Sequence, residues 1–504
     1  MRKAEWIALF ISLAGVAAAF LVAVKVFEAV PHVEDEMAYV WQAKVIAHGQ
    51  MTAPTPPEPK SMYIPFVVDA NGHRSAKYPP GWPVVLALGM LLGIRTWVNP
   101  LLGGLAVWLT FRLGQKICNS PTGLLAALLM VSSPFFLIIT GSLDSNAWSL
   151  VLSIVFVLAW LDTFPLGARK KQVSKPHIPL WLTISVAGLS LGVLVMTRPL
   201  TALGVALPFF VHGLLLLMHG DGATRRHVLG IGVITLLVGS LFLAWQYTVT
   251  GNPFTDPYTL WWSFDRIGFG PGIGVASGGH TLQLGIQNAL IMLTDLKKDL
   301  FGWAGYSWLF LPLGIWALRK NRAAWPTMAV FVCLVICYIC YWASVVRYGP
   351  RYYYEGIYGL TVASAAGIVW LAGSLKARSW QWLRVALVGV VLTGLVGYNL
   401  VVFLPVRLHQ IYGLYDVHRA QLSPFLTAPA HAQTPALVIV HTQKIWTEYA
   451  GLLELEDPWL TSPFIFAWSN AGSISDTTLA ALYPDLHVIY YYTDQPDKLY
   501  SAPR

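Results

Sequence analysis

Long apolar runs separated by short polar segments dominate the chain from its N-terminus to about residue 404. A helix that crosses a bilayer needs roughly 17 to 25 mostly apolar residues, because the lipid core offers the backbone no hydrogen-bond partners. About eleven runs meet this requirement: 6–24, 98–116, 121–140, 147–164, 179–197, 199–218, 228–248, 302–319, 325–345, 356–374 and 385–404. The pattern therefore predicts an α-helical polytopic membrane protein with about eleven transmembrane helices.

Basic residues collect in alternate connecting segments. If the N-terminus lies in the cytoplasm, the positive-inside rule expects Lys and Arg in the loops that this topology places inside. These loops carry Arg112, Lys116, Arg169, Lys170, Lys171, Lys175, Arg225, Arg226, Arg319, Lys320, Arg322, Lys376, Arg378 and Arg384. The apolar stretch 82–94 is too short to cross comfortably, and a crossing there would reverse this agreement. We therefore expect it to form an interfacial helix on the outer side.

Composition narrows the class of protein further. The chain is 56% hydrophobic and 11% charged, which excludes a soluble protein. Its net charge of +9 comes mostly from the cytoplasmic anchors and no nucleic-acid motif is present, so we expect anionic lipid and no nucleic acid as a partner. All four cysteines lie in or beside apolar runs, which excludes a disulfide framework in the outer segments.

Three segments are too long and too polar to be simple connectors: 25–97, 249–301 and 405–504. Loops longer than about 12 to 15 residues are usually functional or disordered, and the many aromatic residues here favour order. We expect residues 1–404 to form a transmembrane domain whose working site is covered by the first two of these segments. We expect 405–504 to form a small α/β lobe outside the cytoplasm, with strands at 436–440 and 487–492 and a helix at 478–483.

Three consecutive carboxylates, Glu34, Asp35 and Glu36, follow the first apolar run. Adjacent like charges raise one another's pKa, so such a cluster is stable where it is solvated, paired with a cation or hydrogen-bonded. One interpretation is a solvated helix start, because carboxylates near a helix N-terminus are favourable. In the other, Asp35 is a general base that deprotonates an attacking hydroxyl. A single displacement with one base inverts the reacting carbon, and we favour inversion.

Arg74 and Lys77 follow in the same outer segment, just before Pro79, Pro80 and Gly81. Proline fixes φ and glycine permits a tight turn, so Lys77 is held on a stiff backbone. A stiff cation suits a phosphate, which Lys binds as a point charge and Arg binds through a bidentate fork. The alternative is that both side chains only extend to anionic lipid headgroups.

Arg351 lies at the outer end of the tenth apolar run, although basic residues in membrane proteins prefer the cytoplasmic side. Glu355 follows it one helical turn later. In one interpretation Arg351 stabilises a departing phosphate. In the other it forms an internal ion pair with Glu355.

The second outer segment contains Asp265 and Arg266, then a glycine-rich run that ends at His280. Dense glycine predicts a mobile flap or a close approach of backbone to a ligand. His280 or His73, with carboxylates such as Asp35, would be ligands for a divalent metal. No metal-ligand spacing is present, so the sequence assigns no certain cofactor and leaves a metal as an alternative.

The order and spacing of these motifs resemble the membrane glycosyltransferases of the GT-C superfamily: Asp35-Glu36 followed by Tyr39, then Lys77-Tyr78-Pro79-Pro80-Gly81, then Gly349-Pro350-Arg351-Tyr352. The similarity is nearest to the bacterial group related to protein O-mannosyltransferases (glycosyltransferase family 39-like) and the aminoarabinose transferase of lipid A. It covers residues 1 to about 375. It implies that a hexose or pentose moves from a polyprenyl-phosphate-linked donor, bound with its tail in the bilayer, to an acceptor hydroxyl.

The resemblance also implies roles for individual residues. Asp35, with Glu36 beside it, matches the catalytic acidic position, and Lys77 matches a phosphate-contacting lysine that Arg74 and Arg351 would assist. Asp144 lies where the aminoarabinose branch has a second acidic residue, and Tyr39 and Glu355 are further candidates on the acceptor side. The acceptor, a lipid, glycan or protein, is left open.

A polytopic transporter of a lipid or glycan is the alternative function. Ion-coupled transporters carry ionisable residues or broken helices near the membrane midplane. Here the interiors of the predicted spans are nearly free of Asp, Glu, Lys and Arg. We therefore expect an enzyme of the cell inner membrane, with its N-terminus in the cytoplasm and its working surface and C-terminal lobe outside.

Overall fold

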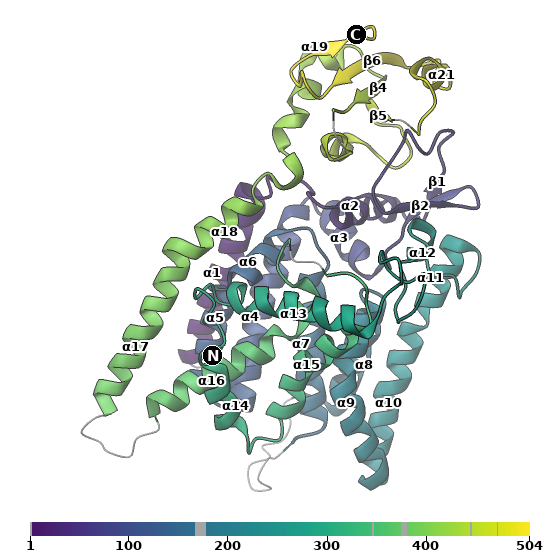
Figure 1. Cartoon of the computed structure of the whole chain (residues 1–504). Coiled ribbons are helices and arrows are strands. Elements are labelled where there is room, and N and C mark those ends of the chain that lie inside the picture. Colours follow the sequence, from purple (N-terminus) through teal and green to yellow (C-terminus); the bar gives the residue numbers. More distant parts are fainter. Residues whose placement is uncertain (1–2, 167–177, 345–346, 374–380, 444–445, 471) are drawn as a thin grey trace.

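Long helices form the body of the molecule, and a small lobe caps one end of it (Figure 1). The computed structural model describes residues 3–166, 178–344, 347–373, 381–443, 446–470 and 472–504. The body contains α1 (Lys3–Lys25), α4 (Val98–Ile117), α5 (Ser120–Val131), α6 (Pro134–Gly141), α7 (Asn146–Thr163), α8 (Leu180–Val195), α9 (Pro199–His219), α10 (Gly222–Gly239), α11 (Leu241–Thr250), α14 (Leu311–Leu318), α15 (Ala324–Ile339), η2 (Arg351–Gly356), α16 (Ile357–Gly373) and α17 (Gln381–Tyr398).

The chain is a multi-pass membrane protein. Six helices of the described residues are long and apolar enough to cross a bilayer, or up to seven if the bent pair α5 and α6 forms one span: Lys3–Lys25, Asn146–Thr163, Pro199–His219, Gly222–Thr250, Arg351–Gly373 and Trp382–Asp416. The predicted count of about eleven stays a prediction. The run 302–319 does not form one helix, because the chain turns at Gly302 and Gly305, both with positive φ, before α14 begins.

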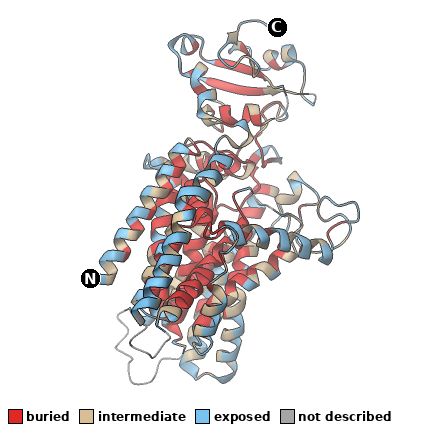
Figure 2. Cartoon of the chain, turned by 60° about the vertical axis from the view of Figure 1, so that its left-hand side comes forward, coloured by how far each residue is buried: buried red, intermediate tan, exposed pale blue. Residues whose placement is uncertain are grey.

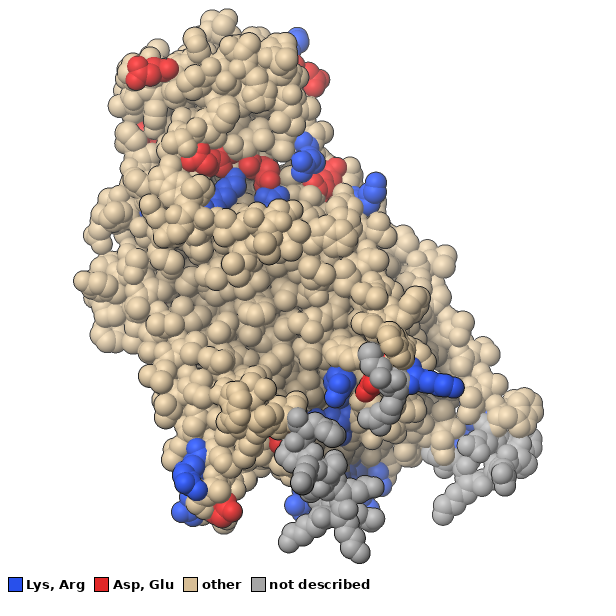
Figure 3. Space-filling model, turned by 180° about the vertical axis from the view of Figure 1, so that it is seen from behind, with Lys and Arg blue, Asp and Glu red and all other residues tan. Residues whose placement is uncertain are grey.

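Charged residues separate toward the two ends of the molecule. Figure 3 shows a broad belt without charge, with mostly Lys and Arg and a few acidic residues below it, and a mixed band of both signs at the base of the lobe. Such a belt is what a lipid-facing surface requires, because a bare charge in hydrocarbon is costly. Several predicted anchors lie outside the described residues: Arg169, Lys170, Lys171, Lys175, Lys376 and Arg378.

The first outer segment is folded around α2 (Glu34–Ala47) and α3 (Gly81–Leu91). Between them lies a small antiparallel sheet of order β1-β3-β2, which the sequence did not predict: β1 (Ala53–Pro54), β2 (Val67–Ala70) and β3 (His73–Ala76). A short turn of helix, η1 (Arg95–Trp97), follows α3. Asn71 and Gly72 join β2 to β3 with positive φ at both positions, as a tight hairpin turn requires. The helix predicted within 82–94 is therefore present as α3.

Gly81 fixes the position of α3 against the end of α8. Its N–H donates to the carbonyl of Met196 at 2.8 Å. A Cβ at this position would lie 2.3 Å from Oγ1 of Thr197 and 2.6 Å from that carbonyl oxygen, so only glycine fits. This contact holds the segment that contains Lys77 close to the outer ends of α8 and α9.

The second outer segment contains α12 (Tyr258–Trp261) and the long helix α13 (Leu282–Asp299). The sequence predicted only a flap here. Thr281 caps α13 by accepting from the N–H of Leu284 at 3.2 Å. Ala289, Met292 and Leu296 form its buried face, whereas Ile286 and Leu290 are exposed. Figure 1 shows α13 lying across the long helices near their outer ends.

The C-terminal lobe is a small α/β unit. Its sheet has the order β5-β4-β6-β7, with β4 parallel to β5 and β6, and these three parallel strands are mostly buried (Figure 2). Both predicted strands are present, whereas β5 was missed. Helix α17 continues through η3, a π-helix (Asn399–Phe403), α18 (Leu404–Ile411) and η4 (Leu414–Asp416), all within the span Trp382–Asp416 that leads up to the lobe. The elements of the lobe are η5 (Arg419–Leu426), α19 (Ala428–His431), β4 (Ala436–His441), α20 (Thr447–Ala450), η6 (Gly451–Leu455), β5 (Phe464–Ser469), α21 (Asp476–Ala481), β6 (His487–Tyr492) and β7 (Leu499–Tyr500).

Lys44 of α2 anchors the lobe to the first outer segment. Its Nζ donates to the carbonyls of Leu453, Glu454 and Glu456 at 3.2, 3.0 and 2.6 Å. Hydrogen bonds to a charged group contribute about 1.5–3 kcal/mol each, so we expect Lys44→Met to destabilise this junction by about 2 kcal/mol or more. Limited proteolysis and the Tm of the purified protein measure the effect. The exposed Lys498→Met is the control, and equal protease resistance in both variants would contradict the anchoring role.

Candidate active site

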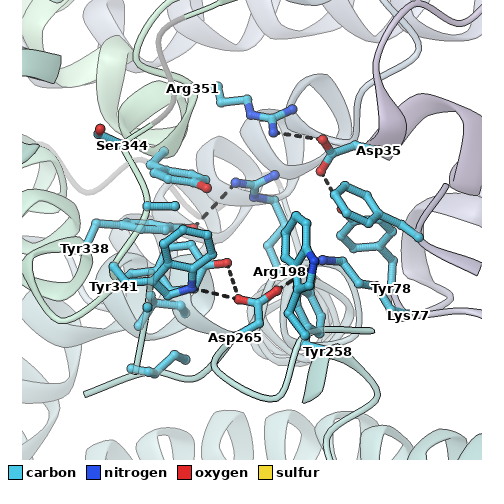
Figure 4. Close-up of a pocket in the computed structure, with 18 of the residues that line it drawn as sticks. Asp35, Lys77, Tyr78, Arg198, Tyr258, Asp265, Tyr338, Tyr341, Ser344 and Arg351 are labelled. Carbon is cyan, nitrogen blue, oxygen red and sulfur yellow. Dashed lines mark hydrogen bonds and ion pairs between the residues drawn. The ribbon is translucent and has the colours of Figure 1, made fainter. Parts of the chain in front are cut away.

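A cavity of about 600 Å³ lies where the two outer segments meet the outer ends of the spanning helices. Figure 4 shows charged side chains that enter it from segments far apart in the sequence. Asp35 comes from the first turn of α2, and Lys77 from the stiff segment between β3 and α3. Arg198 caps the start of α9, Arg351 begins η2, and Asp265 comes from the loop before α13. Residues far apart in the sequence are thereby placed around one volume.

Asp35 is held by two donors. Arg351 Nη2 donates to its Oδ2 at 2.9 Å, and the hydroxyl of Tyr78 donates to its Oδ1 at 2.6 Å. Burial acts to raise the pKa of Asp35, but the charge of Arg351 and these hydrogen bonds outweigh it and hold the pKa below its usual value. The carboxylate is therefore ionised at neutral pH.

Arg351 bridges two carboxylates. Its Nη1 donates to Oδ2 of Asp144 at 2.6 Å, on the opposite side from Asp35. Asp144 is fully buried in the turn between α6 and α7, and its other oxygen accepts from the N–H of Ser145 at 2.6 Å. The alternative ion pair between Arg351 and Glu355 is wrong, because Arg351 is already engaged by these two aspartates.

Glu355 pairs instead with Arg198, whose Nε lies 3.5 Å from its Oε1. Arg198 also donates to Oγ of Ser145 at 3.2 Å, and this hydroxyl lies 3.2 Å from the hydroxyl of Tyr39. The sequence did not assign Arg198 to the site. The available signal was a lone cation between two apolar runs, followed by Pro199, which is an unusual position for a basic residue outside the cytoplasmic loops.

Lys77 lies in an aromatic cage. Its Nζ is 3.7 Å from the ring centre of Phe66 and 4.9 Å from those of Tyr258 and Trp262. The same Nζ donates to Oδ2 of Asp265 at 3.1 Å. Burial lowers the pKa of Lys77, although Asp265 and Asp35 act in the opposite direction. The cage presents one desolvated cation to the cavity.

Asp265 is held by the segment that directly follows α15. Its Oδ1 accepts from the hydroxyl of Tyr341 at 2.8 Å and from Nε1 of Trp342 at 3.0 Å, in addition to Lys77 on the other oxygen. Figure 4 shows Asp265 between Tyr341 and Lys77. With three donors, Asp265 is a positioning partner for Lys77 and leaves Asp35 as the more available carboxylate.

Five predicted site residues do not line this cavity. Two of them, Asp144 and Glu355, are the fully buried partners of Arg351 and Arg198. The other three lie elsewhere. Glu36 is buried and accepts from the N–H groups of His32 and Leu143 at 2.7 and 2.8 Å, so it fixes α2 against the start of α7. Burial raises the pKa of Glu36 to about 7, against these hydrogen bonds. Arg74 lines a different cavity, and Arg266 is exposed. None of the three lines the cavity that contains Asp35.

His280 lines the cavity but does not complete a metal site. Its Nε2 lies 2.9 Å from the carbonyl oxygen of Ile339, and its ring stacks on Phe269. In the part of the chain that the structure describes, no group of three or more His, Cys, Asp or Glu side chains is placed to hold a metal ion. The divalent metal that the sequence left open therefore finds no ligand set here.

Comparison with known proteins identifies the fold. The family model for the oligosaccharyl transferase STT3, N-terminal region, matches residues 83–251. ArnT from Cupriavidus metallidurans, solved with undecaprenyl phosphate, superposes with a TM-score of 0.58 at 15% identity, covering 98% of this chain and 91% of that one. The oligosaccharyltransferase AglB from Archaeoglobus fulgidus, solved with an inhibitory peptide and a dolichol-phosphate, gives 0.53 at 13% identity, covering 90% and 64%. No curated protein sequence matches the chain.

These similarities confirm the predicted resemblance at the level of the fold, which is that of the GT-C membrane glycosyltransferases. The match to ArnT extends over nearly the whole chain, including the C-terminal lobe. Because function is carried by a site and not by a fold, the roles of individual residues rest on the geometry of the cavity.

Proposed function

We propose that the protein transfers a sugar from a polyprenyl-phosphate-linked donor to an acceptor hydroxyl on the extracytoplasmic face, with Asp35 as the general base. The observation that supports this most directly is that an available carboxylate, Asp35, and a caged cation, Lys77, line the same cavity at the outer ends of the spanning helices. A sugar held by its phosphate at Lys77 would lie within the volume that Asp35 also faces. A lipid, glycan or protein hydroxyl would enter from the outer side.

The lowered pKa of Asp35 has two opposite effects on its action as a general base. Its lowered pKa keeps it ionised, which is the state that accepts a proton, but the same shift reduces the driving force for proton transfer. The reaction would form the bond between the acceptor oxygen and the sugar carbon, break the bond to the phosphate oxygen and move the hydroxyl proton to Asp35. We assign the proton transfer to Asp35 alone, since Asp265 is held by three donors and burial raises the pKa of Glu34 and Asp256, which also line the cavity. A single displacement with one base inverts the sugar carbon.

Lys77 would bind the donor phosphate in place of Asp265. An anion that enters the cage meets a cation already stripped of water, so the interaction is stronger than at an exposed lysine. Apolar residues from α9, α11 and α13, namely Leu200, Phe242 and Leu284, line the same cavity and would accommodate the first units of the lipid tail. The structures solved with undecaprenyl phosphate and dolichol-phosphate share this fold, which supports a polyprenyl donor.

The test is transfer of labelled sugar by the purified protein in lipid nanodiscs, with a panel of polyprenyl-phosphate sugars and with lipid, glycan and peptide acceptors. Consumption of one donor with the sugar recovered on one acceptor class is the expected result. Protease protection of tagged termini in inner-membrane vesicles checks the proposed orientation, with the N-terminus inside and the lobe outside. If no donor in the panel is bound or consumed, while reconstituted vesicles take up a lipid or glycan, the transporter alternative is correct instead.

Replacing Lys77 tests the phosphate contact. We expect Lys77→Met to weaken donor binding by about tenfold to a hundredfold, because a hydrogen-bonded charge pair is lost. Since the pKa of Lys77 is lowered, donor binding by the wild type should fall as the pH rises at values below the ordinary 10.5 of lysine. Lys77→Arg keeps its charge and should lose this alkaline fall. Binding isotherms with a polyprenyl phosphate across pH measure both, and identical profiles in the two proteins would exclude Lys77 as the titrating group.

A further inference from the structure

A second cavity, of about 420 Å³, lies between the first outer segment and the C-terminal lobe. It shares no lining residue with the cavity that contains Asp35. One wall comes from α2 and the strands of the outer segment, and the other from the loop after η6 and the segment after α21. Its volume falls within the range of about 300–1,000 Å³ that small-molecule sites occupy.

Two hydroxyls point to a ligand in this cavity. The side-chain oxygens of Thr55 and Tyr483 are buried and meet no hydrogen-bonding partner among the described residues, and both residues line the cavity. A buried polar group without a partner costs about 1–3 kcal/mol. Such groups are rare in native structures and call for an explanation, which a polar ligand would supply.

The charges in this cavity exclude an anion as its ligand. Arg74 contributes the cation, but it already donates four hydrogen bonds, to Asp69 and to the carbonyls of Met62 and Pro59. Glu456 lies opposite, and its Oε2 accepts from the N–H of Phe466 at 2.8 Å. Because no free cationic fork is presented, a phosphate or nucleotide would remain unpaired here.

The remaining wall is apolar. Trp41 and Trp459 line the cavity together with five prolines and five aliphatic side chains: Pro54, Pro56, Pro57, Pro458, Pro484, Ile64, Leu460, Ile465, Leu482 and Leu486. A sugar ring has an apolar C–H face that packs on an indole and a rim of hydroxyls that both donate and accept, which matches hydroxyl and carboxyl partners beside aromatic rings. A neutral sugar therefore fits this lining better than an anion or a hydrocarbon.

We propose that this second cavity is a carbohydrate subsite that holds one or two neutral sugar rings of a glycan acceptor, away from the point of transfer. That the bound glycan is an acceptor rests on the proposed function, whereas the binding of carbohydrate in this cavity does not. Helix α2 carries Asp35 to the first cavity and Trp41 to the second, and the chain that contributes Arg74 to the second continues to Lys77 in the first. A glycan bound here is therefore fixed to the same two elements as the reacting groups, which lowers the entropy cost of presenting its hydroxyl.

The experiment measures binding of a panel of soluble neutral mono- to tetrasaccharides to the full-length protein in nanodiscs, by saturation-transfer NMR and by tryptophan fluorescence. The test variant is the double substitution Thr55→Val and Tyr483→Phe, which removes the two unpartnered hydroxyls and little volume. We expect at least one saccharide to bind to the wild type and the double variant to bind it about tenfold more weakly. The Tm of the double variant should stay unchanged or rise, because no protein hydrogen bond is lost.

Tyr500→Phe is the matched control, because its hydroxyl bonds to Gln495 in the same lobe and does not line the cavity. Asp35→Asn should bind the saccharide as the wild type does. Saccharide binding that depends on the two hydroxyls, in a protein that turns over no donor, would support the subsite and contradict the proposed function. Donor turnover with no saccharide bound, equal binding by the double variant, or binding of a proline-rich peptide in place of sugars would overturn the subsite.

Discussion

Asp35→Asn is expected to lower the rate of sugar transfer by about 10²–10⁴-fold, the range that a general base contributes, while donor binding stays close to that of the wild type. Asparagine has the shape of aspartate: its oxygen still accepts from Arg351, and its NH2 group can donate to the Tyr78 hydroxyl, but it takes no proton. Arg351 also keeps its partner Asp144, so the fold should persist. Single-turnover transfer in nanodiscs, with donor binding measured on the same samples, separates the two effects.

The matched control is Asp162→Asn, which removes one carboxylate at the far end of α7, where it pairs with Lys116. This exposed pair contributes little, so rate and donor affinity should both stay near wild type. A loss of donor binding in Asp35→Asn equal to its loss of rate would mean that Asp35 positions the donor. A rate equal to that of the wild type would remove Asp35 from the chemistry.

Three site residues could be predicted from the sequence because each has a charge that is unusual at its position in a membrane protein. Asp35, Lys77 and Arg351 were recognised because acidic crowding, a stiff proline-bounded lysine and an outer arginine each contradict the average pattern of a membrane protein. Their convergence in one cavity was not predictable from spacing, because 316 positions separate Asp35 from Arg351. Only the resemblance to a known fold ordered these motifs into one site.

The errors have physical causes as well. Arg74 has the same charge as Lys77 and lies three positions away, but alternation along β3 turns it toward Asp69 and the second cavity. Arg198 was passed over because its role depends on tertiary contacts with Ser145 and Glu355, which no local pattern reports. Helix α13 was missed because its sequence is amphipathic and follows a glycine-rich run, so neither its length nor its hydropathy marks it as a span.

Arg351→Gln is expected to have the largest effect on stability, about 3–5 kcal/mol, because it leaves two buried carboxylates without their cation. Asp144 is fully buried and the side chain of Asp35 is 16% exposed, so water compensates neither of them fully. Transfer should fall below detection, since Asp35 would keep only the hydrogen bond from Tyr78 and would lose the cation that orients it. The Tm in nanodiscs and the transfer rate measure the two losses. Arg504→Gln, which breaks an exposed pair with Asp494, is the control and should change neither.

The double variant Arg351→Gln with Asp144→Asn separates the loss of charge balance from the loss of shape. If the destabilisation comes from unpaired buried carboxylates, removing the charge of Asp144 should restore about 1–3 kcal/mol, a coupling that contacting residues commonly show. Sugar transfer should not return, because Asp35 still lacks the hydrogen bond from Arg351 that orients it. Equal Tm values for the single and double variants would show that Arg351 acts through packing, whereas recovery of transfer would show that Asp35 does not need its cation.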